Sequence, residues 1–175
     1  MQPAEHNFWK KLPKPFFALA PMADVTDAPF RRLIAKYSRH GEIDGGPHVF
    51  WTEFVSADGL ASAGREALKI DLLYTESERP IVAQLFSSRP EKMRAAAKLC
   101  AELGFDGVDI NMGCPDKSVE KSGCGAALIK NPPRARELIR AAKRGGNRGC
   151  ASQVCTTGKC VPVSVKTRIG YNIDE

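Results

Sequence analysis

The sequence has 175 residues, of which 43% are hydrophobic and 26% are charged, and its formal net charge is +6. These values are ordinary for one soluble globular domain. No apolar run approaches the ~20 residues that a membrane span needs, and the start lacks the pattern of a secretory signal. Membrane-spanning and secreted proteins are therefore excluded, and we expect a cytoplasmic protein. The positive charge favours a polyanionic partner, although its spread along the chain fits a solvated basic surface equally well.

The cysteines indicate neither disulfides nor a metal centre. In a reducing compartment, thiols stay reduced, and we therefore expect no disulfides. The last three cysteines are separated by gaps of four residues in a Gly/Ser/Thr-rich loop, and no histidine follows His48. Zinc ligands usually have another spacing and a second pair nearby, so we expect no metal site. The six residues are Cys100, Cys114, Cys124, Cys150, Cys155 and Cys160.

Along the chain, predicted strands alternate with predicted helices. Residues 1–15 are polar and rich in proline, which indicates an irregular leader before a domain over residues 16–175. Apolar runs predict five buried strands, at residues 16–20, 49–55, 80–86, 105–110 and 161–167. Caps and apolar stripes predict a helix that begins after a cap at Thr26 or Asp27, with Pro29 in its first turn, and runs to residue 37. They also predict helices over 90–103 and 132–145, with some helix in 58–70 and one helical turn in 116–130.

This alternation predicts a parallel sheet with crossover helices. An open nucleotide-binding sheet usually carries G-x-G-x-x-G after its first strand. That position here reads Pro21-Met22-Ala23-Asp24, so a (β/α)₈ TIM barrel is favoured. Such barrels need eight strands and typically ~250 residues. With about five strands, we expect the chain to form the first part of a barrel, truncated at the carboxyl end.

The turn after the fourth strand is the first candidate functional site. Gly113 and Pro115 flank Cys114, which forces a bend at the thiol. In α/β proteins, ligands bind at the carboxyl ends of the strands. A buried packing thiol is the alternative interpretation of this turn.

Five segments together resemble the tRNA-dihydrouridine synthases, over residues ~16–172. Each segment follows or ends a predicted strand, except one that lies in the loop beyond the fourth strand. They are Ala20-Pro21-Met22-Ala23, Gln84-Leu85, Asn111-Met112-Gly113-Cys114-Pro115, Gly123-x-Gly125-Ala126-x-Leu128 and Val165-Lys166-Thr167-Arg168-Ile169-Gly170.

The resemblance implies an FMN-binding barrel that reduces a uracil of tRNA, with NADPH as reductant. Hydride goes to carbon 6 of the base, and Cys114 protonates carbon 5. A cysteine thiol of ordinary acidity is mostly protonated at neutral pH, as a proton donor must be. The other implied positions bind the flavin: Pro21, Met22 and Ala23 by backbone, Gln84 at the polar edge of the ring, Asn111 beside flavin and base, Lys166 at N1 and O2, and Arg168 at flavin or RNA.

Alternatives remain open from the residues alone. Gln84 fits a role in satisfying a backbone group, Asn111 fits a turn former, and Lys166 fits a solvated strand end. Glu53 ends an apolar strand without a motif to assign it, and Trp51 is expected in the core. Another FMN barrel, such as a dihydroorotate dehydrogenase-like enzyme, and an inactive truncated product are the rival functions.

Overall fold

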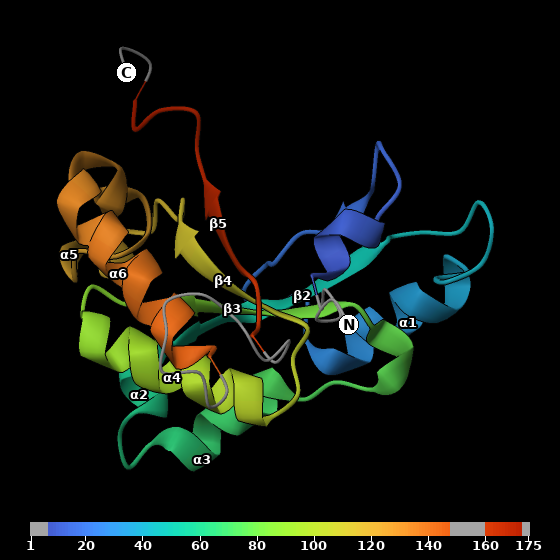
Figure 1. The fold of residues 1–175 in the computed structure, drawn as a ribbon, viewed down its shortest axis with the longest axis horizontal. Coiled ribbons are helices and arrows are strands. Elements are labelled where there is room, and N and C mark those ends of the chain that lie inside the picture. Colours follow the sequence, from blue (N-terminus) through green and yellow to red (C-terminus); the bar gives the residue numbers. More distant parts are fainter. Residues whose placement is uncertain (1–6, 148–159, 173–175) are drawn as a thin grey trace, which may run out of the picture.

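The structure is a computed structural model that describes residues 7–147 and 160–172 (Figure 1). Within these residues, five parallel strands form one sheet in the order β1-β2-β3-β4-β5. Sequential order with a crossover between parallel neighbours is the arrangement of a partial (β/α)₈ barrel, so the predicted fold class is confirmed. The strands are β1 (Ala18–Leu19), β2 (Val49–Ser56), β3 (Ile81–Phe86), β4 (Gly107–Met112) and β5 (Val163–Thr167).

The longer helices begin where the sequence predicts them. Asp27 caps α1 by accepting a hydrogen bond from the Phe30 N–H at 2.9 Å, and Asn131 caps α6 in the same way. Gly104, at φ +90°, ends the turn after α4. The helices are α1 (Ala28–Tyr37), α2 (Ala57–Leu60), α3 (Arg65–Leu68), α4 (Pro90–Glu102), α5 (Lys117–Lys121) and α6 (Pro132–Gly145). The 3₁₀ helices are η1 (Phe8–Lys11), η2 (Lys69–Leu72), η3 (Glu76–Glu78) and η4 (Gly125–Lys130).

The main core lies between the sheet and the helices along its outer face (Figure 1). Alternate residues of β3 and β4 point into it, including Leu85 of β3 and Ile110 of β4, which are fully buried. Met93 and Cys100 of α4 pack against them. Burial raises the pKa of the Cys100 thiol to about 12, so this cysteine is core, as predicted.

The inner face of the sheet is closed at the amino-terminal end of the strands. Trp51 and Val82 lie in register there, and η1 packs its apolar side chains Phe8 and Trp9 against them. A Cβ at Gly107 would lie 3.2 Å from the Phe8 ring, so the close approach of η1 depends on this glycine. Trp51 is therefore core, as predicted, and η1 forms a helix within the stretch expected to be irregular.

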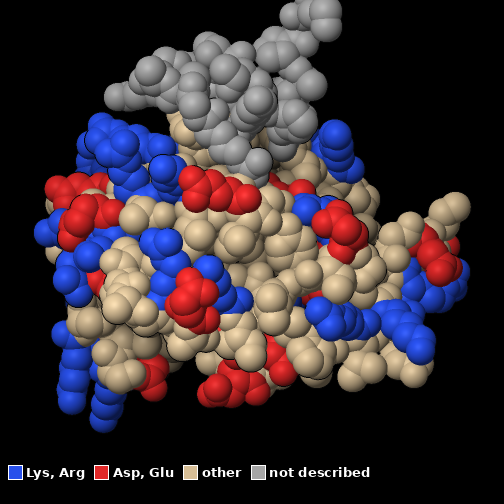
Figure 2. All heavy atoms as spheres, turned by 90° about the horizontal axis from the view of Figure 1, so that it is seen from below, with Lys and Arg blue, Asp and Glu red and all other residues tan. Residues whose placement is uncertain are grey.

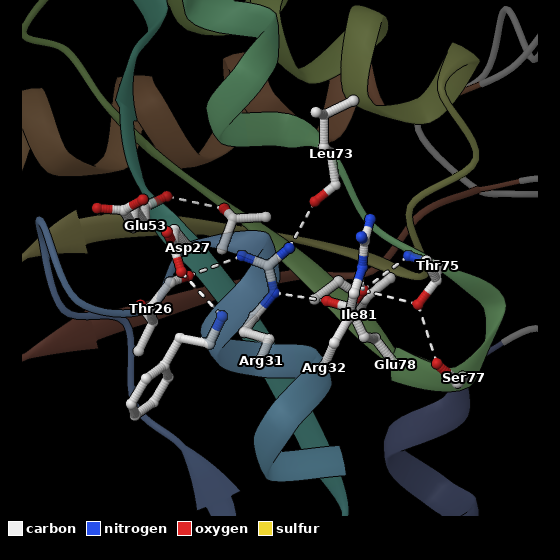
Figure 3. Close-up of polar contacts among 12 residues, drawn as sticks. Thr26, Asp27, Arg31, Arg32, Glu53, Leu73, Thr75, Ser77, Glu78 and Ile81 are labelled. Carbon is white, nitrogen blue, oxygen red and sulfur yellow. Dashed lines mark hydrogen bonds and ion pairs between the residues drawn. The ribbon is translucent and has the colours of Figure 1, made fainter. Parts of the chain in front are cut away.

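A fully buried ion pair connects α1 to the segment before β3 (Figure 3). The Arg31 guanidinium donates to the Glu78 carboxylate at 2.7 Å, to the Thr26 carbonyl at 2.7 Å and to the Leu73 carbonyl at 2.5 Å. The Thr26 hydroxyl in turn accepts from the Met22 N–H at 2.9 Å. Arg31 therefore supports the loop between β1 and α1, which carries predicted site residues.

Candidate active site at the carboxyl ends of the strands

Three neighbouring strands bring polar side chains together on the inner face of the sheet. Gln84 of β3 lies in register with Asp109 of β4, and Asp109 lies in register with Ser164 of β5. Two residues further along, Asn111 lies in register with Lys166. Partners in a parallel ladder share a face, and residues two apart in a strand also share it. All five side chains therefore belong to the inner face, beyond the layer that η1 closes.

Four of these side chains form a hydrogen-bonded ladder across the three strands. The Ser164 hydroxyl donates to Asp109 Oδ1 at 2.6 Å, and Gln84 Nε2 donates to Asp109 Oδ2 at 2.7 Å. Asn111 Nδ2 then donates to Gln84 Oε1 at 3.2 Å. Gln84 is fully buried and Asn111 is 6% exposed, whereas Ser164 at the other end of the ladder is half-buried.

The Asp109 carboxyl has an elevated pKa because burial disfavours its charge. The hydrogen bonds from Ser164 and Gln84 lower this pKa again in part, as does the positive charge of Lys166. Lys166 is exposed, so its ammonium is available at the surface beside the buried carboxyl.

Both the backbone N–H and the carbonyl of Cys114 are hydrogen-bonded. Asn111 Oδ1 accepts from the backbone N–H groups of Gly113 at 3.1 Å and Cys114 at 2.9 Å. The Cys114 carbonyl accepts from the Ala126 N–H at 2.9 Å. Gly125 has φ +58°, and a Cβ there would lie 2.5 Å from the Cys114 carbonyl oxygen. The Gly-x-Gly-Ala motif thus allows η4 to pack against the turn, and the Cys114 thiol is free and half-buried.

The remaining predicted residues lie at the same end of the sheet. Pro21, Met22 and Ala23 follow β1, and Met22 is 40% exposed. Arg168 follows β5, is exposed, and its Cγ would lie 3.4 Å from a Cβ placed on Gly113. The structure therefore brings Arg168 beside the Cys114 turn, whereas β1 is separated from β4 by two strands.

Sequence reasoning assigned no role to Asp109, Ser164 or Glu53. Asp109 and Ser164 each interrupt an apolar strand, and that interruption is the signal that identifies them. Glu53 lies in β2 where the register shifts between Trp51 and Phe54, so alternation does not place it. Its carboxylate accepts from the Asp24 N–H. Burial raises the Glu53 pKa, and neighbouring carboxylates raise it further.

The charged surface is mixed in character. Figure 2 shows lysine and arginine interspersed with aspartate and glutamate over the face that it presents. Among residues 7–147 and 160–172, the structure has no cluster of three metal-ligating side chains. No helix in these residues has both the length and the apolar character of a membrane span.

The loop with three cysteines departs from expectation at one residue. Cys160 is disulfide-bonded, so the expectation that every cysteine is reduced is wrong there. Cys150 and Cys155, which we also expected to be reduced, lie outside the described residues.

The donors at this end of the sheet fit the edge of a flavin ring. An exposed ammonium at Lys166 and the second amide N–H of Asn111, whose first donates to Gln84, are suited to an electron-rich heterocycle whose rim carries carbonyl oxygens and ring nitrogens.

Comparison with known proteins identifies close relatives. A family profile described as dihydrouridine synthase (Dus) matches residues 18–175. The probable tRNA-dihydrouridine synthase 2 of Bacillus subtilis (strain 168) is 44% identical over 171 residues, which are 97% of this chain and 46% of the relative. The probable tRNA-dihydrouridine synthase of Staphylococcus aureus (strain COL) is 41% identical, over 98% of this chain and 46% of the relative. That of Staphylococcus epidermidis (strain ATCC 12228) is 40% identical, over 98% and 47%. The chain spans about half the length of these relatives.

Proposed function

The chain belongs to the dihydrouridine synthase family, and from this premise we propose that it carries the uracil- and flavin-facing strands of an enzyme that reduces a uridine in tRNA. Its relatives carry the name tRNA-dihydrouridine synthase. Because the chain spans 46% of the Bacillus relative, the activity of a whole enzyme is part of the proposal.

One observation carries the proposal. A free, half-buried thiol at Cys114 sits on a turn whose N–H and C=O are both hydrogen-bonded, and Asn111 in that turn lies in register with Lys166 on the adjacent strand. A proton donor and a cation are thereby held at one end of two neighbouring strands. Fixed positions of this kind favour a reaction because the groups need no reorganisation.

FMN, reduced by NADPH, supplies the hydride for carbon 6 of the uracil when it is bound. Lys166 would hold its ammonium beside the flavin N1 and O2, where it stabilises negative charge. Asn111 would face the polar edge of the ring and the target base, and the fully buried Gln84 would act on that edge through its hydrogen bond with Asn111. Pro21, Met22 and Ala23 would present backbone against the ring, and Arg168 would contact flavin or RNA.

Cys114 holds the proton that carbon 5 receives. General acid catalysis requires a group that is protonated at the working pH and lies within reach of the reacting atom. The hydrogen bond that the Cys114 N–H donates to Asn111 and the one that its carbonyl accepts from Ala126 fix the backbone of this residue, so its thiol varies in position only through its own side-chain rotation.

The tRNA substrate agrees with the net charge of +6. A base in folded RNA must leave its stack to reach such a site, which costs roughly a few kcal/mol. Contacts between basic side chains and phosphates offset part of this cost. A tRNA substrate also agrees with a cytoplasmic location.

The test uses a bacterial strain that lacks its own dihydrouridine synthases. The gene product that carries this sequence is expressed there, and dihydrouridine in the tRNA is measured by mass spectrometry of nucleosides. We expect the modified base to appear, together with bound flavin in the purified protein. Folded, flavin-loaded protein that leaves the tRNA unmodified would contradict the proposal. Binding to tRNA that weakens steeply with salt separates it from an enzyme for free pyrimidines.

A further inference from the structure

The orientation of the Asn111 amide is set by backbone donors. The N–H groups of Gly113 and Cys114 both point at one atom of this amide, at 3.1 and 2.9 Å. A backbone N–H can only donate, so that atom must be the oxygen Oδ1. The nitrogen Nδ2 therefore faces Gln84, and it meets an acceptor there, Oε1, at 3.2 Å.

The same reasoning fixes the orientation of the Gln84 amide, and Asp109 is the last acceptor of the ladder. With Oε1 engaged by Asn111, the Gln84 nitrogen points to Asp109 Oδ2, at 2.7 Å. An ionised carboxylate only accepts, so it suits this orientation alone. If Asp109 takes up a proton, Ser164 can accept it from Oδ1, because a hydroxyl both donates and accepts. The direction of the ladder is therefore the same in either protonation state.

The unused hydrogen-bonding capacity of Asn111 follows from this accounting. Its oxygen already accepts two hydrogen bonds, and its nitrogen has given one of its two hydrogens to Gln84. The second N–H is what remains for a ligand at the Asn111 end of the ladder, where the residue keeps 6% of its surface exposed.

We propose that Asp109 is a positioning residue which, through Gln84, supports the Asn111 orientation that the Gly113 and Cys114 N–H groups set, with an N–H donor toward the ligand, so that the ligand atom there is a carbonyl oxygen or an unprotonated ring nitrogen of a flat heterocycle. The proposal rests on the proposed function, in which both the flavin and the uracil carry such atoms. Asp109 itself touches neither and acts through the two amides.

Exchanging the two residues of β4 tests this directly. Asn111→Asp keeps the acceptor for the Gly113 and Cys114 N–H groups but places a second oxygen against Gln84 Oε1. Gln84 then has to turn, and its oxygen meets the Asp109 carboxylate. Adding Asp109→Asn supplies a donor for that oxygen, and Ser164 still donates to the new amide oxygen. The double variant therefore has a complete ladder of reversed direction and the net charge of the wild type.

Stability and ligand binding should respond differently to the exchange. In thermal unfolding without ligand, Asn111→Asp should be less stable than wild type, and the added Asp109→Asn should recover most of the loss. FMN affinity, or kcat/KM for tRNA, should stay at least about ten-fold below wild type in the double variant, because residue 111 now offers an acceptor. A role in folding alone would restore stability and binding together.

Two measurements identify the ligand atom. Weakened FMN binding in a fluorescence titration assigns the acceptor to the flavin, whereas unchanged FMN binding with reduced kcat/KM for tRNA assigns it to the uracil, and either result supports the proposal. Wild-type FMN affinity and kcat/KM in the double variant would overturn it, as would a double variant no more stable than Asn111→Asp. The unfolding measurements need no activity, so they still decide the ladder if the proposed reaction is not observed.

Discussion

Replacing Gly125 by alanine should displace the Cys114 turn. The added Cβ would lie 2.5 Å from the Cys114 carbonyl oxygen and 2.9 Å from Val119 Cγ1. Both distances are below any normal contact, and the oxygen belongs to backbone that cannot rotate away. Gly125 also has φ +58°, where a residue with a Cβ is strained.

The cost has two components of known size. A left-handed conformation costs a residue with a Cβ roughly 1–2 kcal/mol. Forcing an extra carbon into a packed site costs roughly 1–3 kcal/mol. We therefore expect Gly125→Ala to lower the free energy of unfolding by roughly 2–5 kcal/mol, measured by denaturant titration.

Gly123→Ala is the matched control. Gly123 also has positive φ, at +73°, but the nearest atom to its added Cβ is Ser88 Cβ at 3.5 Å, an ordinary contact. This variant should show only the backbone cost of roughly 1–2 kcal/mol. The rate at which a thiol reagent modifies Cys114 should change in Gly125→Ala and stay at the wild-type value in Gly123→Ala. Equal stability and equal Cys114 reactivity in the two variants would refute the assignment of Gly125 to this turn.

Three further predictions concern charged groups. Glu53→Gln should be more stable than wild type at pH 7, because the fold raises the Glu53 pKa and the wild-type protein therefore loses stability as pH rises. The melting temperatures of the two proteins should converge near pH 4, about the pKa of this carboxyl in the unfolded chain; a constant difference across pH would contradict this. Glu78→Gln should lower the free energy of unfolding by about 3–5 kcal/mol, because it leaves the Arg31 charge buried without its partner; a loss no larger than that of Glu76→Gln, in an exposed pair, would count against it. Lys166→Met should weaken FMN binding at least about ten-fold in a fluorescence titration; unchanged affinity would remove Lys166 from the flavin site.

Local pattern predicted the strands, because buried parallel strands are continuous apolar runs that sequence shows directly. β1 is shorter than its apolar run, residues 18–19 against 16–20, and the Phe17 N–H donates to the His48 ring instead of to a strand. The η1 helix was not predicted, because Phe8 and Trp9 are ordered by contacts with strands far along the chain.

The common position of these side chains at one end of the sheet was predictable, and their hydrogen bonds were not. Strand-end reasoning places Asn111 and Lys166 at one end of the sheet, and their register agrees with it. The pairing of Ser164 with Asp109 joins residues 55 positions apart and depends on strand register. A slip of one residue would turn these side chains to the opposite face, so only the assembled sheet reveals the ladder.

The most direct test of the central claim compares two cysteines ten positions apart. Cys114→Ala removes the proposed proton donor, whereas Cys124→Ala alters a buried free thiol in the adjoining loop. In the gene product that carries this sequence, Cys114→Ala should retain bound FMN and form dihydrouridine in tRNA at least about a hundred-fold more slowly. Cys124→Ala should retain both properties. Dihydrouridine formation at the wild-type rate in Cys114→Ala would contradict the assignment of Cys114 as the proton donor.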